Sequence, residues 1–238
     1  RGLELAAAFV EGKIRNQINF IKYYSRAGRH KDAVFDAHCE QAITKMQALL
    51  DQLESLISDE NLEQAHARLF AFEGHSASHY WGLIKTLLSA DVYFTGRERR
   101  GATDLVNSLL NYGYGILYGR VHEAVVLAGL NPNVSFLHAE QVGKPTLVFD
   151  LVEEFRQPVV DKAVIGMIRR KEELHMDGPR LTHETKQKVI NAVIERLNAR
   201  VRYRTERVML REVIHRQAKA LASALEGKGR YRPFIDQW

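Results

Sequence analysis

Cysteine and proline are both scarce in this sequence of 238 residues. The single cysteine, Cys39, excludes an internal disulfide and any zinc or iron–sulfur site that needs several cysteines, and it is compatible with a cytoplasmic protein. Only five prolines are present, and none of them precedes Pro132. Because proline breaks helices, its absence from the first half of the chain favours long helices there.

Long apolar runs and glycine-rich phosphate loops are also missing. No segment approaches the ~20 apolar residues that a membrane-spanning helix needs, so we expect no membrane partner. Gly113 and Gly115 lie within a helical pattern and lack the preceding strand that a dinucleotide-binding fold requires. They indicate instead that this helix packs closely against another backbone.

Helical periodicity is present over most of the chain, and no strand pair is evident. Thr103 and Thr182 are the expected N-caps of two of the helices, and residues 177–179 should break another. Four long helices are predicted at about residues 3–25, 31–57, 60–90 and 103–128. Further helices are predicted to begin at Pro145, to run from Thr182 to about residue 200, and to end at about residue 225. We therefore predict an all-α fold, a bundle-like multi-helix domain.

Positive charge is concentrated near the C-terminus. From residue 169 onward the chain has 17 Lys and Arg against 9 Asp and Glu, a balance of +8, whereas the first 168 residues have 17 against 20, a balance of −3. Five arginines recur in steps of four, four, three and four residues and would share one face of a continuous helix: Arg196, Arg200, Arg204, Arg207 and Arg211. Such a stripe is either a phosphate-binding surface or a solvated helix face.

Residues 129–161 interrupt the helices and hold the most suggestive set of side chains. His138 precedes Asp150 by twelve residues, and Glu153 lies one helical turn beyond Asp150 among apolar neighbours. Two buried carboxylates are costly unless a cation compensates, and oxygen ligands with one imidazole suit Mg²⁺ or Mn²⁺. The alternative is a helix N-terminus, where acids interact favourably with the helix dipole. We expect a further carboxylate from elsewhere, and Glu73 is a candidate, unless it pairs locally.

Other metal patterns in the sequence are weaker. His75 and His79 have the spacing of a zinc-binding pair, but Ser76 stands where a metalloprotease needs glutamate. Two Glu-x-x-His pairs, Glu172/His175 and Glu212/His215, resemble ligands of di-iron bundles. Because both look solvent-facing, a di-iron protein is only a minor alternative.

The order of these motifs resembles one family, the CRISPR-associated integrase/endonuclease, the larger protein of the universal spacer-acquisition pair. The similarity runs over essentially the whole chain. The matching segments are residues 10–17 (a Lys-x-x-Asn-Gln helix), 73–74, 80–81, 104–114, 129–132, 137–138, 150–156 and 231–234.

The resemblance implies a C-terminal helical catalytic domain over residues 1–238, excised from a longer chain with an N-terminal β-rich dimerisation domain. It implies metal ligands at Glu73, His138 and Glu153, with Asp150 beside them, and Mg²⁺ or Mn²⁺ as the cofactor. Which of the two acids binds the metal directly is left open, because many members have aspartate where this chain has Glu153.

The resemblance also implies an activity and partners. Family members insert new spacer DNA into a CRISPR array by transesterification with a 3′-hydroxyl, or cleave DNA with water. The expected partners are double-stranded and branched DNA, a second copy of the chain, and a small dimeric adaptation protein that bridges two integrase dimers. Candidate DNA contacts are Arg97, Arg99, Arg156, the arginine stripe, Tyr80 and Trp81, although the two aromatic residues are more typical of a core. A non-catalytic helical DNA-binding scaffold is the main alternative.

Overall fold

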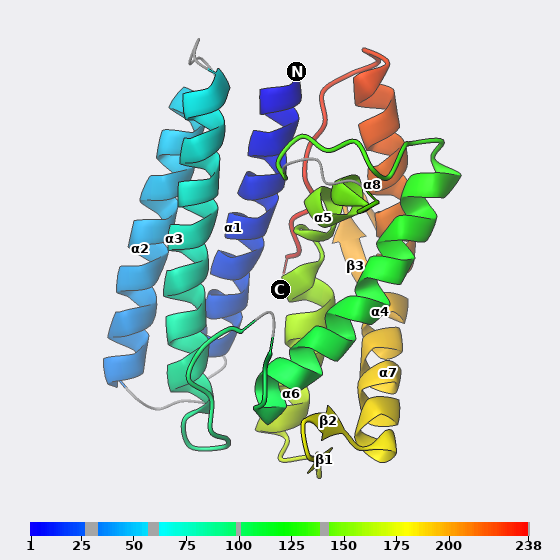
Figure 1. Cartoon of the computed structure of the whole chain (residues 1–238). Helices are drawn as coiled ribbons and strands as arrows, with labels where there is room; N and C mark the ends of the chain where they lie inside the picture. Colours follow the sequence, from blue (N-terminus) through cyan, green and yellow to red (C-terminus); the bar gives the residue numbers. More distant parts are fainter. Residues whose placement is uncertain (27–32, 57–61, 99–100, 139–142, 238) are drawn as a thin grey trace.

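The computed structural model describes residues 1–26, 33–56, 62–98, 101–138 and 143–237. Three long helices form one side of the molecule: α1 (Gly2–Arg26), α2 (Ala33–Leu56) and α3 (Leu62–Leu88). On the other side, α4 (Leu105–Leu127) crosses in front of α7 (His183–Asn198) and α8 (Leu210–Leu225), as Figure 1 shows. The short helices α5 (Thr146–Val152) and α6 (Lys162–Arg169) lie between the two sides, joined by a π-helix, η1 (Arg156–Asp161). The predicted all-α fold is confirmed.

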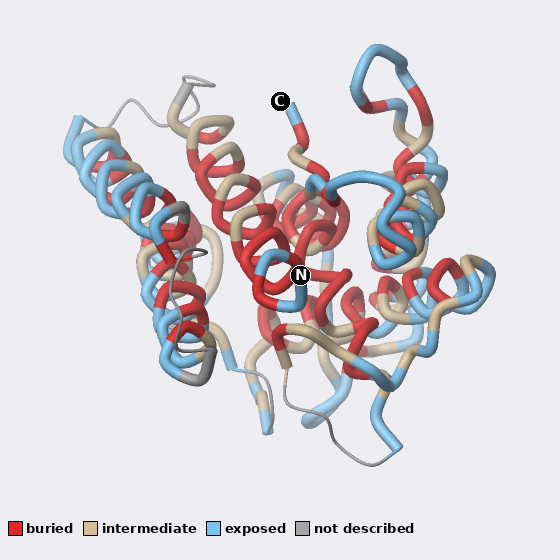
Figure 2. The backbone as a smooth tube through the Cα atoms, turned by 90° about the horizontal axis from the view of Figure 1, so that it is seen from above, coloured by how far each residue is buried: buried red, intermediate tan, exposed pale blue. Residues whose placement is uncertain are grey.

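Helix α1 is the centre of the core. Its residues 5–10 are all buried, whereas α2 and α3 turn exposed faces to solvent (Figure 2). A helix buried on nearly every side must satisfy its polar side chains within the protein. Lys13, Asn16 and Gln17 are buried on α1. The amide of Asn16 bonds the Glu154 and Phe234 carbonyls at 2.9 Å each and accepts from the backbone N–H of Asp236 at 2.8 Å, which fixes the C-terminal tail against α1.

Helix α4 packs closely against η1 at Gly113, where the neighbouring group is the side chain of Val160. A Cβ added at Gly113 would lie 2.7 Å from Cγ1 of Val160, whereas one at Gly115 would meet nothing within 4 Å. Close packing is therefore found at Gly113 alone, and its neighbour is the Val160 side chain, not another backbone as expected. The N-cap of α4 is Asp104 and not Thr103, because the Asp104 carboxylate accepts from the N–H of Asn107 at 2.9 Å.

Two small antiparallel strand pairs correct the expectation that strands are absent. Strands β1 (Met176–Asp177) and β2 (Arg180–Leu181) flank the expected break at residues 177–179. Strands β3 (Arg200–Tyr203) and β4 (Glu206–Met209) form a hairpin between α7 and α8. This hairpin interrupts the region in which a continuous helix would have aligned the five arginines of the stripe, so they do not share one helix face. Within the described residues, no helix is long and apolar enough to cross a membrane.

Candidate functional site

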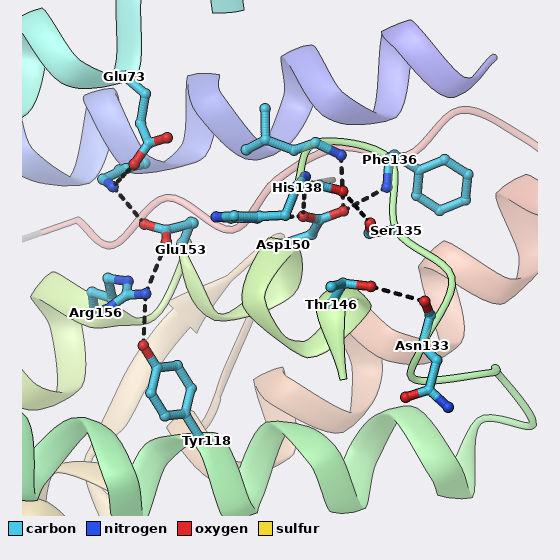
Figure 3. Close-up of polar contacts among 12 residues, drawn as sticks. Glu73, Tyr118, Asn133, Ser135, Phe136, His138, Thr146, Asp150, Glu153 and Arg156 are labelled. Atoms are coloured by element: carbon cyan, nitrogen blue, oxygen red, sulfur yellow. Dashed lines mark hydrogen bonds and ion pairs between the residues drawn. The ribbon is translucent and has the colours of Figure 1, made fainter. Parts of the chain in front are cut away.

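Two carboxylates from distant parts of the chain meet at one ammonium group. Lys13 Nζ on α1 lies 2.5 Å from Oε1 of Glu73 on α3 and 2.7 Å from Oε2 of Glu153, which directly follows α5. The two oxygens are therefore no farther apart than the sum of these distances, 5.2 Å. Figure 3 shows the Glu73 and Glu153 side chains pointing toward one another. All three side chains are buried.

Glu153 stays ionised because two cations face it. Its Oε1 lies 2.9 Å from Nη2 of Arg156, while Lys13 faces Oε2. Burial alone would raise the pKa of Glu153, but the positive charges of Arg156 and Lys13 outweigh burial and lower the pKa to about 2. Oε2 is within ion-pair distance of Lys13 but has no hydrogen-bond donor in good geometry. A buried carboxylate oxygen without a hydrogen bond is a natural ligand for a cation.

Asp150 organises the loop that carries His138. Its carboxylate is fully buried and accepts the backbone N–H groups of Phe136 (2.7 Å), Leu137 (3.0 Å) and His138 (3.1 Å). It also lies 2.7 Å from Nδ1 of His138. Because all four contacts of Asp150 go to the loop of residues 136–138, Asp150 positions His138. Of the two acids, Glu153 is the one that faces Glu73.

His138 is held with one ring nitrogen available. A carboxylate accepts hydrogen bonds, so Nδ1 donates to Asp150, and in the neutral ring Nε2 is then the nitrogen with a free lone pair. The ring stands edge-on between Phe70 and Phe149, with centroid distances of 6.2 and 6.1 Å. In Figure 3 the ring extends from Asp150 toward the side on which Glu73 and Glu153 lie.

This set of donors fits a hard divalent cation, although it is not a closed cage. Among the described residues, no three His, Cys, Asp or Glu side chains gather closely enough to hold a metal ion. What the site offers is two converging carboxylate oxygens and an imidazole whose other nitrogen is held by a carboxylate. Hard oxygen ligands with one imidazole suit Mg²⁺ and Mn²⁺, and a carboxylate behind a histidine is usual at metal sites. The donor types of Glu73, Glu153 and His138 therefore suit such an ion, but in this structure Lys13 lies between the two carboxylates and the three side chains are not gathered around one point.

Most of the chain matches one protein family. The family described as CRISPR associated protein Cas1 matches residues 1–195. The chain belongs to the Cas1 family. A CRISPR-associated endonuclease Cas1 of Archaeoglobus fulgidus is 30% identical over 250 residues, which cover 100% of this chain and 72% of the relative. One from Thermus thermophilus is 38% identical over 240 residues, covering 98% of this chain and 69% of the relative. The resemblance recognised in the sequence is confirmed.

Solved structures share the fold. A casposase bound to integration product matches with a TM-score of 0.81 at 25% sequence identity, covering 98% of this chain and 67% of that chain. A Cas1 protein from Thermotoga maritima matches with a TM-score of 0.77 at 20% identity, covering 97% of this chain and 67% of that chain.

Two residues expected to contact DNA make contacts within the protein beneath this Cas1 site. Arg156 is partly buried, binds Glu153 and the Tyr118 hydroxyl (2.9 Å), and lies over the Tyr114 ring at 4.8 Å. Tyr80 is fully buried and donates to Asp161 at 2.8 Å. Tyr80 does not reach solvent, whereas the Arg156 side chain is 13% exposed, and DNA contacts of both residues stay predictions.

Other candidate DNA residues have mixed surroundings. Trp81 packs against the core and meets Phe94 edge-on at 6.2 Å. Arg97 donates to Asn107 (2.9 Å) and Asn111 (2.6 Å), which fixes it at the start of α4.

One arginine of the stripe is partly buried and the other four are exposed. Arg196 donates to the Pro158 carbonyl at 3.0 Å and is partly buried. Arg200, Arg204, Arg207 and Arg211 are exposed. Arg99 lies outside the described residues.

The di-iron alternative finds no support. Glu172 binds Arg170 at 2.7 Å at the surface, and Glu212 is exposed on α8. With His175 and His215 they form no group of metal ligands within the part of the chain that the structure describes.

Sequence reasoning missed the role of Lys13, although the residue stands in the motif at residues 10–17. The signal was available: Lys13 lies between Val10 and Ile14 on the same helix, where a charged side chain is expected to be buried only with a partner.

Proposed function

We propose that this chain is the catalytic domain of a metal-dependent DNA integrase, which joins the 3′-hydroxyl of incoming spacer DNA to a phosphate of a CRISPR array. The observation that carries the proposal is the convergence of Glu73 and Glu153 on one buried cationic position, with His138 held beside it. Two comparisons support it: relatives named as endonucleases, and the shared fold of a casposase bound to integration product.

The residues would divide the chemistry between them. When bound, Mg²⁺ or Mn²⁺ would polarise the scissile phosphate and favour ionisation of the attacking hydroxyl. Glu73 and Glu153 supply negative charge at one point, and Arg156 keeps Glu153 ionised and in place. Asp150 fixes the tautomer of His138, so that Nε2 either ligates the ion or accepts the hydroxyl proton.

The bond changes of the proposed reaction balance without a further reactant. The attacking 3′-oxygen bonds to phosphorus as its proton leaves, the bond from phosphorus to the target strand's 3′-oxygen breaks, and that oxygen gains a proton. With water as the nucleophile, the same steps cleave the strand.

The proposed partners are branched and double-stranded DNA, a second copy of the chain, and the small dimeric adaptation protein. Family membership supports them. The fold also occurs in a solved Cas6-RT-Cas1–Cas2 complex, with a TM-score of 0.78 at 19% identity.

Strand transfer from an oligonucleotide 3′-end into a repeat-containing plasmid tests the proposal. Glu73→Gln, Glu153→Gln and His138→Ala should each reduce transfer at least ~100-fold, as expected for loss of groups that act on the transition state, while DNA binding persists. The matched control is Glu123→Gln, an exposed glutamate on α4, which should retain wild-type transfer. Wild-type transfer by the triple variant in chelator would contradict the proposal and favour a non-catalytic scaffold.

A further inference from the structure

A basic trough runs between the β3–β4 hairpin, α8 and the C-terminal tail. Its first part is a hollow of about 640 Å³ lined by four arginines, Arg202, Arg204, Arg230 and Arg232, and no Asp or Glu is among its lining residues. All four arginines are exposed. None of Glu73, His138 or Glu153 lines it, so the trough is separate from the candidate active site.

A second hollow continues the first. It measures about 590 Å³, and Tyr203, Arg204 and Arg230 line both hollows. It adds three cations, those of Arg216, Lys219 and Lys228. Its one lining carboxylate, Glu206, is bound by Arg216 at 3.1 Å. The continuous trough therefore has seven cations and one carboxylate along its walls.

Folding does not account for this concentration of arginine. Arg230 and Arg232 make no ion pair with any described residue. Arg202 stands directly opposite Arg207 in the hairpin ladder, where like charges destabilise the pairing. Arg204 begins the two-residue turn with φ +56°, a conformation that glycine and asparagine adopt more readily. Exposed arginines that form no ion pair with a described residue, two of them at unfavourable positions of the hairpin, indicate an anionic ligand.

The floor of the trough is held rigidly. The Tyr203 hydroxyl donates to Gln217 at 3.0 Å, and Gln217 donates to buried Glu154 at 2.8 Å. The guanidinium groups of Arg204 and Arg216 lie over the Tyr203 ring at 5.4 and 5.8 Å. Figure 1 shows β3 in the region of α8, toward the middle of the molecule. Arginines over a fixed ring are pre-organised, so less conformational entropy is lost when they bind an anion.

We propose that this trough binds the sugar–phosphate backbone of one DNA strand, without regard to base sequence. Guanidinium groups recognise phosphates in pairs of hydrogen bonds, and a row of cations suits a ligand with a repeating negative charge. Hollows of this size are typical of ligand-binding sites, and they admit one DNA strand. The only aromatic side chain on the shared wall, Tyr203, is buried, so bases have no stacking platform there. The choice of DNA as the polyanion rests on the proposed function.

Binding of a fluorescent 30-nucleotide oligothymidine tests the proposal, measured by anisotropy over a series of salt concentrations. All proteins carry Glu73→Gln, so that no chemistry occurs. The trough variant adds Arg202→Gln, Arg230→Gln and Arg232→Gln. The control variant instead adds Lys45→Gln, Lys85→Gln and Arg180→Gln, which removes the same charge from exposed positions on α2, α3 and β2. Thermal melts verify that both variants fold.

The trough variant should bind at least ~10-fold more weakly at low salt, and its salt slope should fall by about 2, since each lost phosphate contact on a single strand accounts for ~0.7. The control should change affinity less than ~2-fold. Equal weakening of both variants would overturn the proposal, because net charge alone would then explain it. Unchanged binding of oligothymidine by the trough variant would overturn the proposal too. Fluorescent poly-glutamate is the second probe: if the trough variant loses binding of poly-glutamate but retains binding of oligothymidine, the proposal is also overturned, because the trough would then suit an acidic protein partner. This test measures binding without catalysis. A negative result therefore does not contradict the proposed integrase function, and a negative strand-transfer result does not contradict DNA binding by the trough.

Discussion

Lys13 and Glu153 hold opposite charges 2.7 Å apart, with side chains only 5% and 1% exposed. Glu73 shares the same ammonium at 2.5 Å. Lys13 thus balances part of the negative charge of the two carboxylates, at the point where the proposed divalent cation would bind them.

Replacing Lys13 by methionine should destabilise the protein strongly. The change removes the ammonium group that the two buried carboxylates share, and loss of one partner of a buried ion pair costs about 3–5 kcal/mol. Urea unfolding in chelator measures this loss, and added Mn²⁺ should restore part of it by binding the folded state. Arg15→Ala, which removes a partly exposed pair on α1 with Glu11, should cost less than about 1 kcal/mol. Equal stability of Lys13→Met and wild type would refute this role for Lys13.

Asp150→Asn should impair the site while the fold persists. Asparagine offers one acceptor oxygen where the carboxylate accepts three backbone N–H groups and His138 Nδ1. Loss of the carboxylate behind a ligating histidine typically costs about 10–100-fold in metal affinity or activity. Titration of Mn²⁺ by electron paramagnetic resonance measures the affinity, and circular dichroism checks the helices. An affinity equal to that of the wild type would show that the position of His138 does not depend on Asp150.

Stability should depend on pH through Asp161. Burial raises the pKa of Asp161 to about 6, although hydrogen bonds from Tyr114 and Tyr80 oppose the rise. Between pH 4 and 6 the folded protein therefore keeps a proton that the unfolded chain has lost. The contribution of Asp161 to stability is full below this window and falls as pH rises through it, by on the order of 3 kcal/mol.

The variant Asp161→Asn removes this titration. Its stability relative to the wild type, measured by urea unfolding, should increase from pH 4 to 6 and then stay level. A stability difference that is the same at pH 4 and pH 7 would exclude a raised pKa at Asp161.

Two glycines of α4 offer a matched pair. Gly113→Ala places a methyl group 2.7 Å from Val160 Cγ1 and should destabilise by about 1–3 kcal/mol. Gly115→Ala has open space and should stabilise by up to about 1 kcal/mol, since alanine is the better helix former. Thermal unfolding distinguishes them. Val160→Ala combined with Gly113→Ala should recover stability relative to the sum of the single changes; strict additivity would argue against the close contact.

The sequence predicted the long helices well because their signals are local. Absent prolines and apolar spacing place α1, α2, α3 and α4 to within a few residues. The β3–β4 hairpin was missed for an equally local reason. Its turn, Arg204-Thr205, lacks the Asn-Gly type of signal, and arginines at steps of three and four imitate a helix face. The alternation of buried Val201 and Tyr203 with exposed arginines was the contrary evidence.

The candidate site was predictable only in part. His138 and Glu153 are near in sequence, so spacing alone could link them, whereas Glu73 required the family motifs. The Lys13 contact with Glu73 spans 60 residues, and no periodicity encodes such a contact. Arg156 looked like a surface cation because the sequence does not show that Glu153 and Tyr118 enclose it.

The hydrogen bonds of Asn16 have a consequence for how the chain folds. Its amide joins the Glu154 carbonyl to the C-terminal tail, and the contact with Asp236 spans 220 residues. The buried amide of Asn16 on α1 has all of its partners only when residues 234–236 pack against this helix. Contacts of such long sequence separation slow folding. We therefore expect α1 to complete its packing late in folding, when residues 234–236 join it.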